Sequence, residues 1–301
     1  MNNGQNDDGI TQLKRRHSDI SILSTKVNDG YAGGANRGAL SAMGDALLFL
    51  NPDVELETRC AELLLERLAA SNGAVCGPVV IDGAGNPEFG LSVDLLGDPV
   101  GLKSPQQPLY LCGCAVAATR EVFEALDGFA APFFMFCEDL DFCWRALLQG
   151  YEVATVIEAR AIHRGGGSTP GGYVARGRIE VTAFRIALRE RNTLATILTC
   201  APAAWLAIVL PIRLVRILVI AAVATIVGRP DLARELFHGV IWFIRRLPEY
   251  SRRRGQFGGR PKVRRRVFWD RAVRDVNSLR VILRHLKRFQ SRNRATEKAG
   301  R

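Results

Sequence analysis

The sequence predicts an α/β fold followed by a helical region that associates with a membrane. Three observations support this. Between residues 20 and 163, short apolar runs typical of strands alternate with segments of helical periodicity. Two groups of polar and acidic residues lie close to the ends of such segments, and ligands of open α/β sheets bind at the carboxyl ends of strands. Beyond residue 191, two long stretches contain no charged side chain.

The first part of the chain is polar and then rich in glycine. Residues 1–19 lack hydrophobic periodicity, and we expect them to be disordered. Residues 20–24 are predicted to form a strand. Residues 31–36 are predicted to form a loop whose glycines permit a close approach to a ligand, and a helix begins at residues 37–43.

The central part alternates strands and helices. Strands are expected at residues 47–50, 74–81, 109–117 and 151–162, and helices at residues 57–70, 120–126 and 140–149. Thr119 is the expected N-cap of the second helix, and Gly150 the expected end of the third. A turn at residues 82–85 opens a variable loop that continues to Pro108.

An acidic cluster follows an aromatic run at residues 134–141. It contains Glu138, Asp139 and Asp141. Apolar surroundings and neighbouring like charges raise the pKa of a carboxyl group, which is how a general base is tuned toward neutral pH. The alternative is that the cluster only caps a helix and complements its dipole. Arg145 can pair with Asp141 at i,i+4, which would leave Asp139 free for chemistry.

A second polar group follows the apolar run at residues 47–50. It consists of Asn51 and Asp53, on either side of a proline. This pattern is also a good turn. The order of the two groups along one α/β chain favours the functional interpretation, a metal-bound phosphate ligand beside a base.

These residues carry a resemblance to a known family. Residues 28–38 and 50–53, Cys112-Gly113, Gly128-Phe129 and residues 134–141 resemble the successive motifs of family 2 glycosyltransferases, in particular the bacterial rhamnosyltransferase-like subgroup. The resemblance implies a GT-A-like fold, a partial Rossmann-like mixed sheet flanked by helices. It also implies hexosyltransferase-type transfer of a sugar, rhamnose in that subgroup, from a nucleotide-sugar donor with inversion.

The resemblance also implies roles for individual residues. Asp53 takes the place of a metal ligand, His163 a place near the metal or diphosphate, and Asp139 the place of the base, with Glu138 and Asp141 as alternatives. The implied metal is Mg²⁺ or Mn²⁺, which suits oxygen ligands. The positions implied to contact the donor are Gly33, Gly34, Asn36, Asn51, Cys112 and Gly113.

The chain departs from the family at its front. Family members usually begin with a βαβ unit that binds the nucleobase and ribose, which needs roughly 30 residues. Only about twenty residues precede the first expected strand. We therefore expect either a start upstream of this chain or a truncated copy. A truncated copy allows an alternative function, a catalytically impaired glycosyltransferase that serves as a membrane-attached interaction module.

The cysteines indicate a reducing compartment. The seven cysteines are odd in number, and their closest pair, Cys112 and Cys114, lacks common metal-site spacing. No secretory signal is apparent at the start of the chain. We interpret the cysteines as small buried apolar residues in a cytosolic setting.

The hydrophobic segment predicts membrane association. Residues 192–212 and 217–228 carry no charge and are separated by a stretch with Arg213 and Arg216. The first run is just long enough to span a bilayer, at about 20 residues. We favour a helical hairpin that dips into the cytoplasmic leaflet, with the arginines at its turn. A single span with an interfacial helix, or a pair of buried core helices, are the alternatives.

Charge is distributed unevenly. The first 244 residues have a net charge of −5, whereas residues 245–301 have +16. A basic segment of this kind binds an anionic membrane surface or nucleic acid, and the adjacent apolar runs favour the membrane over nucleic acid. The predicted location is the cytoplasmic face of a bacterial plasma membrane, with a cell-envelope polysaccharide or a lipid-linked glycan as acceptor.

The predicted organisation has five parts. They are a disordered tail (1–19), a truncated GT-A domain (20–165), a glycine-rich loop with a connecting helix (166–192), membrane-associated helices (193–248) and a basic tail (249–301). The glycine-rich loop is interpreted either as a lid over the donor or as a plain linker.

Overall fold

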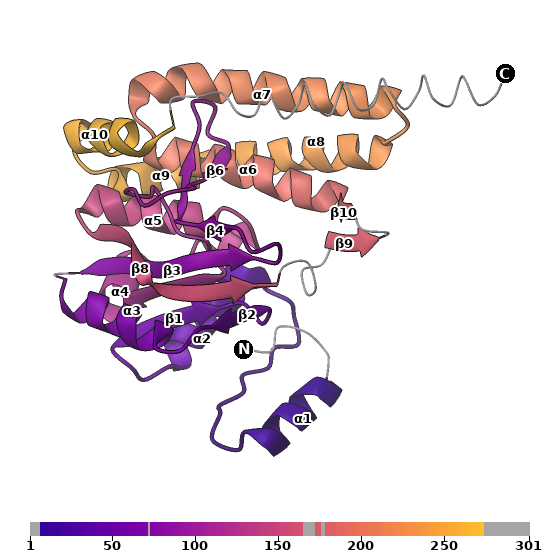
Figure 1. Cartoon of the computed structure of the whole chain (residues 1–301). Helices are drawn as coiled ribbons and strands as arrows, with labels where there is room; N and C mark the ends of the chain where they lie inside the picture. Colours follow the sequence, from indigo (N-terminus) through magenta and orange to yellow (C-terminus); the bar gives the residue numbers. More distant parts are fainter. Residues whose placement is uncertain (1–6, 72, 165–171, 176–177, 274–301) are drawn as a thin grey trace.

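The computed structural model describes residues 7–71, 73–164, 172–175 and 178–273 of the chain (Figure 1). A mixed β-sheet carries helices on both faces, and the C-terminal helices stack beyond one of these faces (Figure 1). The predicted α/β class with a C-terminal helical region is confirmed.

The main sheet has six strands. Its order is β1 (Ala46–Leu50), β7 (Ala115–Thr119), β3 (Ala74–Asp82), β8 (Glu152–His163) and β2 (Val54–Leu56), with β4 (Pro87–Glu88) paired to β3. Strands β3 and β8 are parallel, whereas β7 is antiparallel to both β1 and β3. Strands β1, β3 and β8 therefore run in one direction, and their carboxyl ends meet at one edge.

Each face of the sheet is covered by helices. Alternate residues of β3 point to opposite faces, so Ala74 and Cys76 belong to one apolar cluster and Val75 to another. Helix α3 (Cys60–Ala69) covers the first face with Leu64 and Leu68. The second face carries α2 (Gly30–Ser41), α4 (Arg120–Ala125) and α5 (Glu138–Gln149).

Most of the predicted central elements are confirmed within a few residues. Thr119 caps α4, because its hydroxyl accepts a hydrogen bond from the Val122 amide at 3.2 Å. Gly150 ends α5 with a φ of 92°, a conformation that glycine adopts without strain. Strand β7 begins later than predicted, since Tyr110 instead forms a bridge with Leu91 of β5 (Leu91–Val93), which pairs with β6 (Pro99–Gly101).

The predictions for the N-terminal part are partly wrong. Residues 7–16, expected to be disordered, form helix α1 (Asp7–Arg16), whose last turn carries Lys14, Arg15 and Arg16 beside the negative end of the helix dipole. Residues 20–24 are irregular apart from an isolated bridge at Ser24. The sheet ends at β1, so this segment does not extend it.

The predicted glycine-rich loop is the first half of helix α2. Gly30 has a φ of 70°, and a Cβ there would lie 2.1 Å from the Phe134 carbonyl oxygen. The Ala32 amide donates to that same oxygen at 3.1 Å. These glycines therefore allow α2 to pack closely on the segment before α5.

The segment after β8 also differs from the prediction. Residues 172–175 and 178–181 form the paired strands β9 (Gly172–Ala175) and β10 (Arg178–Val181), where a helix was predicted. The predicted glycine-rich lid falls largely on residues 165–171, outside the described residues.

The C-terminal helices pack on one another and on α5. They are α6 (Ala183–Cys200), α7 (Ala203–Ile226), α8 (Pro230–Arg245), α9 (Leu247–Phe257) and α10 (Pro261–Arg271). The boundary expected at residue 192 falls inside α6, whose Leu194, Ala195 and Ile197 are buried. The first charge-free run is thus divided, because α6 ends in the body of the protein and a new helix starts after Pro202.

The predicted helical hairpin is wrong. Helix α7 is continuous through Arg213 and Arg216, which do not lie at a turn. Both arginines bind Asp98 and Glu190, and the Arg213 side chain is only 1% exposed. Because the body of the protein supplies these two carboxylates, the helix continues past both charges.

The basic segment also begins within the body. Tyr250, Phe257 and Phe268 are buried, and the Phe268 ring stacks on Trp144 with their centroids 5.9 Å apart. The residues of the predicted basic tail that lie in α9 and α10 are therefore packed against α5 and α6. Residues 274–301 lie outside the described part of the chain.

Candidate active site

The site lies where the carboxyl ends of β1, β3 and β8 meet. Asp82 is opposite His163 in the parallel pair of β3 and β8, and Val54 of β2 is also opposite His163. Asp53, directly before β2, therefore reaches the same edge. The Asp53 Oδ1 and His163 Nε2 atoms are 3.4 Å apart.

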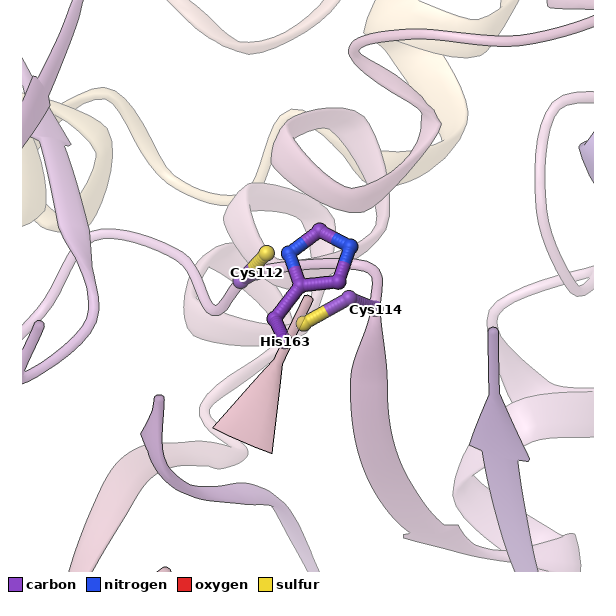
Figure 2. A group of neighbouring side chains, drawn as sticks. All are labelled: Cys112, Cys114 and His163. Atoms are coloured by element: carbon purple, nitrogen blue, oxygen red, sulfur yellow. The ribbon is translucent and has the colours of Figure 1, made fainter. Parts of the chain in front are cut away.

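A loop with two cysteines lies at this edge, directly before the antiparallel strand β7. Leu50, the last residue of β1, is paired with Ala115, the first residue of β7. The Asn51 amide donates to the Cys114 carbonyl oxygen at 2.9 Å. Cys112 and Cys114 are thereby placed beside His163 (Figure 2).

Asp53 has the properties expected of a cation ligand. Its Oδ1 atom is buried and has no hydrogen-bond partner among the described residues, and the nearby His163 offers a ring nitrogen. An orphaned carboxylate oxygen beside an imidazole fits a divalent cation. The structure therefore brings together the two residues predicted to bind metal, and they fit such an ion.

Asp139 faces the same loop from the first turn of α5. Its Oδ2 accepts a hydrogen bond from the Gly113 amide at 3.0 Å, and its Oδ1 accepts one from the Leu140 amide at 2.7 Å. Burial raises the pKa of Asp139, although these two hydrogen bonds and the Arg189 charge oppose the rise. A carboxylate held in this way is poised for proton transfer.

Glu138 lies beside Asp139 and is buried. Burial raises the pKa of Glu138 well above its usual range, and the Asp139 charge raises it further. Its Oε2 atom has no hydrogen-bond partner within the described structure. Glu138 is therefore favoured in its protonated form next to an ionised Asp139.

Asp141 has a different environment. Its Oδ2 accepts a hydrogen bond from Arg145 Nε at 2.8 Å, and both side chains are fully buried. Arg145 also donates to the carbonyl oxygens of Leu126 and Gly128. The structure thus assigns Asp141 to an ion pair that joins α5 to the end of α4, away from the Cys112–Cys114 loop.

The predicted donor-contacting residues of α2 are used for packing. Gly33 and Gly34 are buried in the helix, and a Cβ at Gly33 would lie 2.6 Å from the Asp29 Cβ. The Asn36 side chain donates to the Phe129 carbonyl oxygen and accepts from the Phe129 amide, both at 2.9 Å. These contacts place the three residues in the contact between α2 and the 128–134 segment.

Three further residues belong to the site and were not predicted as part of it. The Tyr31 hydroxyl donates to the Gly113 carbonyl oxygen at 2.6 Å, so α2 also holds the cysteine loop. Arg189 of α6 acts electrostatically on Asp139 and is exposed. Asn192 contacts the backbone before α5. Of these, Tyr31 lay in a segment with a sequence signal, residues 28–38 of the family resemblance.

The segment before Glu138 has an unusual backbone. Phe134, Phe136 and Cys137 have φ values of 67°, 68° and 64°, respectively. Non-glycine residues rarely adopt such values, and this conformation is found most often at functional sites. The contacts of Asn192 with this segment indicate how it is held directly before the two carboxylates.

A comparison with protein families agrees with this geometry. Residues 1–126 match the model of glycosyl transferase family 2. This part of the chain is similar to that family. The match covers the sheet edge with Asp53 and the cysteine loop and ends before α5, so Asp139 and His163 lie outside it.

One curated protein similar to this chain is the low-salt glycan biosynthesis hexosyltransferase Agl10 of Haloferax volcanii. The two are 27% identical over 161 residues, which are 49% of this chain and 52% of the relative. The chain thus matches about half the length of this relative.

Solved structures support the GT-A-like fold. GalNAc-T7, solved with UDP, GalNAc and Mn²⁺, superposes with a TM-score of 0.53 at 14% identity, over 66% of this chain and 40% of its own. TarS 1–349 of S. aureus, in complex with UDP-GlcNAc, has a TM-score of 0.50 at 14% identity, over 87% and 78% of the two chains. At this identity the comparison shows that the chain shares the fold with both.

Proposed function

We propose that this protein transfers a hexose from a nucleotide-sugar donor to a glycan or lipid-linked acceptor, with inversion at the anomeric carbon. The observation that carries the proposal is the array Asp53, His163, Cys112–Cys114 and Asp139, whose members lie next to one another at one sheet edge. It places a candidate cation site and a candidate base on either side of one loop. The hexosyltransferase relative and the UDP-sugar complex of TarS support this choice of substrate class.

In this proposal, Asp53 and His163 hold Mg²⁺ or Mn²⁺. When bound, such an ion offsets negative charge on a diphosphate leaving group. The exposed guanidinium of Arg189 lies on the Asp139 side of the site and provides further positive charge. The solved complex of GalNAc-T7 contains Mn²⁺ and is consistent with this choice of ion.

Asp139 acts as the base in this proposal. Its ionised carboxylate accepts the proton of the acceptor hydroxyl as that oxygen attacks the anomeric carbon. The Gly113 and Leu140 amides hold the carboxylate in place, and Glu138 remains protonated beside it. No second nucleophile is needed for a single displacement, so inversion is the expected stereochemistry.

We further propose that the protein lies on the membrane surface through α7. This helix is the one described helix that is long and apolar enough to cross a bilayer, and 17% of its apolar stretch is buried. Its inward stripe contains Trp205, Val209, Arg213 and Ile217. Its outward stripe is apolar and exposed, at Ile208, Ile212, Val215, Val219, Val223 and Ile226.

The arginines favour surface docking over spanning. A spanning α7 would carry Arg213, Arg216 and their partners Asp98 and Glu190 into the bilayer, at a large cost. A helix lying in the interface keeps these charges in the body and presents its apolar stripe to lipid. The net charge of +16 over residues 245–301 adds attraction to an anionic leaflet, which favours the cytoplasmic face.

The test of the catalytic proposal is donor turnover by the full chain in the presence of Mn²⁺ and candidate acceptors. Asp139→Asn should lower the rate by about 10²–10⁴-fold while leaving the circular dichroism spectrum unchanged. Asp53→Ala should weaken Mn²⁺-dependent binding of nucleoside diphosphate in calorimetry. Near-normal turnover by Asp139→Asn would contradict the assignment of the base. Binding of UDP without any turnover would instead support the membrane-attached interaction module.

A further inference from the structure

The cysteine loop and the end of β8 bring together two thiols and an imidazole. One ligand atom each of Cys112, Cys114 and His163 lies within 4.8 Å of the other two. Figure 2 shows the three side chains pointing toward one another, with the cysteines on one turn and His163 coming from β8. Because β7 is antiparallel to its neighbours, it begins at this edge, and the cysteines before it therefore lie close to His163. The spacing of the cysteines in the sequence does not predict this arrangement.

We propose that Cys112, Cys114 and His163 form a binding site for a thiophilic divalent cation, with Zn²⁺ as the physiological ion. Two thiolates and one imidazole are ligands that Zn²⁺ prefers and that Mg²⁺ avoids. The fourth position is left to Asp53 or to water. This site goes beyond sugar transfer, because it binds its ion whether or not the chain turns over a donor.

The geometry is close to that of a tetrahedral site. With Zn–S bonds of about 2.3 Å, two thiolates on one tetrahedral ion are about 3.7 Å apart. The observed limit of 4.8 Å between ligand atoms exceeds this by about 1 Å, a change that side-chain rotation can supply. No movement of the β7–β8 framework is needed.

The surroundings of the three ligands are also suitable. Cys114 is buried and packs against Val80 and Ala115, whereas Cys112 is partly exposed and provides an entry path. The buried Oδ1 of Asp53, which has no hydrogen-bond partner in the described part of the chain, lies 3.4 Å from His163 Nε2. It can therefore complete the coordination or hold the imidazole, as carboxylates commonly do in zinc sites.

The other five cysteines have different surroundings from Cys112 and Cys114. Cys60, Cys76, Cys137, Cys143 and Cys200 are buried within apolar clusters. Among the described residues, the group of Cys112, Cys114 and His163 is the one that brings three potential metal ligands together. Cys60, the first residue of α3 and part of the apolar cluster with Leu64 and Leu68, is therefore a suitable control position.

The site has a consequence that rests on the proposed function. Asp53 and His163 would serve both the thiophilic ion and the Mg²⁺ or Mn²⁺ of sugar transfer. The two ions would then compete, and Zn²⁺ would inhibit turnover in a manner that excess Mn²⁺ relieves. Cys112→Ser should reduce this inhibition, because it removes a thiolate and leaves Asp53 and His163 in place.

The decisive experiment is a titration of the reduced, metal-free full chain with Co²⁺. The wild type should bind one equivalent and show thiolate-to-cobalt charge transfer with the intense visible bands of tetrahedral Co²⁺, both lost on adding Zn²⁺. Cys112→Ser and His163→Gln should each weaken Co²⁺ binding by at least about tenfold. Cys60→Ala should match the wild type, and circular dichroism should show all variants folded.

Two results would overturn the site. One is a wild-type Co²⁺ spectrum without thiolate charge transfer. The other is equal Co²⁺ affinity in the wild type, Cys112→Ser and His163→Gln. The titration uses no nucleotide, so an intact cobalt spectrum together with absent turnover would reject sugar transfer and retain the metal site.

Discussion

The side-chain nitrogen of Asn192 lies 2.8 Å from the carbonyl oxygen of Phe136. The same nitrogen lies 3.0 Å from the carbonyl oxygens of Phe133 and Met135. One buried amide of α6 therefore holds the strained segment that leads into Glu138 and Asp139. This contact connects the C-terminal helical layer to the candidate base.

We predict that Asn192→Leu impairs both stability and turnover. The substitution keeps the side-chain volume but leaves buried carbonyl oxygens without a donor, at a cost of about 1–3 kcal/mol for an unsatisfied group. Urea denaturation would measure the loss, and turnover would be corrected for the folded fraction. Thr199→Val removes only a hydrogen bond within α6 and serves as the control. Full corrected turnover by Asn192→Leu would show that the segment does not need this contact.

Whereas Asp139→Asn is predicted to lower the rate of turnover, we predict that Asp141→Ala lowers the free energy of unfolding. It leaves the fully buried Arg145 without its carboxylate, and breaking a buried pair costs about 3–5 kcal/mol. The measurement is the free energy of unfolding in urea. Arg59→Ala, which removes an exposed pair with Glu62, should change it by less than about 1 kcal/mol. A stable Asp141→Ala protein without turnover would instead assign Asp141 to catalysis.

The raised pKa of Glu138 predicts that the free energy of unfolding depends on pH. Its pKa is raised in the folded state, first by burial and then by the Asp139 charge. Stability linked to Glu138 is therefore full below the unfolded-state pKa and is lost as pH rises through the folded-state pKa. Glu138→Gln cannot ionise, so thermal unfolding of this variant should lose less stability than the wild type between acid and alkaline pH. Parallel pH profiles for the two proteins would contradict the assignment.

The outward stripe of α7 should govern membrane binding. We predict that Ile212→Glu with Val219→Glu releases the full chain from vesicles containing anionic lipid in a flotation assay. Each change places a charge on the exposed apolar face and leaves the Arg213 and Arg216 pairs intact. Met43→Glu, at a 96% exposed position of the body, is the matched control and should float like the wild type. Flotation of the double variant at wild-type level would show that α7 is not the anchor.

The ion pairs that Arg213 and Arg216 form in the middle of α7 should set the orientation of this helix on the body of the protein. Burial favours a higher pKa for Asp98, but Arg213 and Arg216 outweigh it and lower that pKa to about 2. The carboxylate is therefore ionised throughout the physiological range, and the pairs persist there. This is why α7 is fixed to the body by its inward face and leaves its apolar stripe outward.

The sequence by itself determined the α/β class and most central elements, and it indicated which residues are candidates for chemistry. Strand and helix periodicity located β3, α3, α5 and β8, because each buries a regular apolar pattern. The acidic and aromatic composition near Asp139 and the polar end of β1 were visible without coordinates. Long charge-free runs were also visible and indicated an apolar helix.

Only the tertiary structure decided how these residues are used. The antiparallel direction of β7 brought Cys112 and Cys114 to His163, and strand direction is set by the whole sheet rather than by local pattern. The same applies to the surroundings of Asp139 and Asp141, since the two differ in which partner, the Gly113 amide or Arg145, the fold brings near. Helix α7 was mistaken for part of a hairpin because Asp98 and Glu190, which accept its arginines, are distant in sequence. Partners far apart along the chain are joined by packing, and no local sequence signal records them.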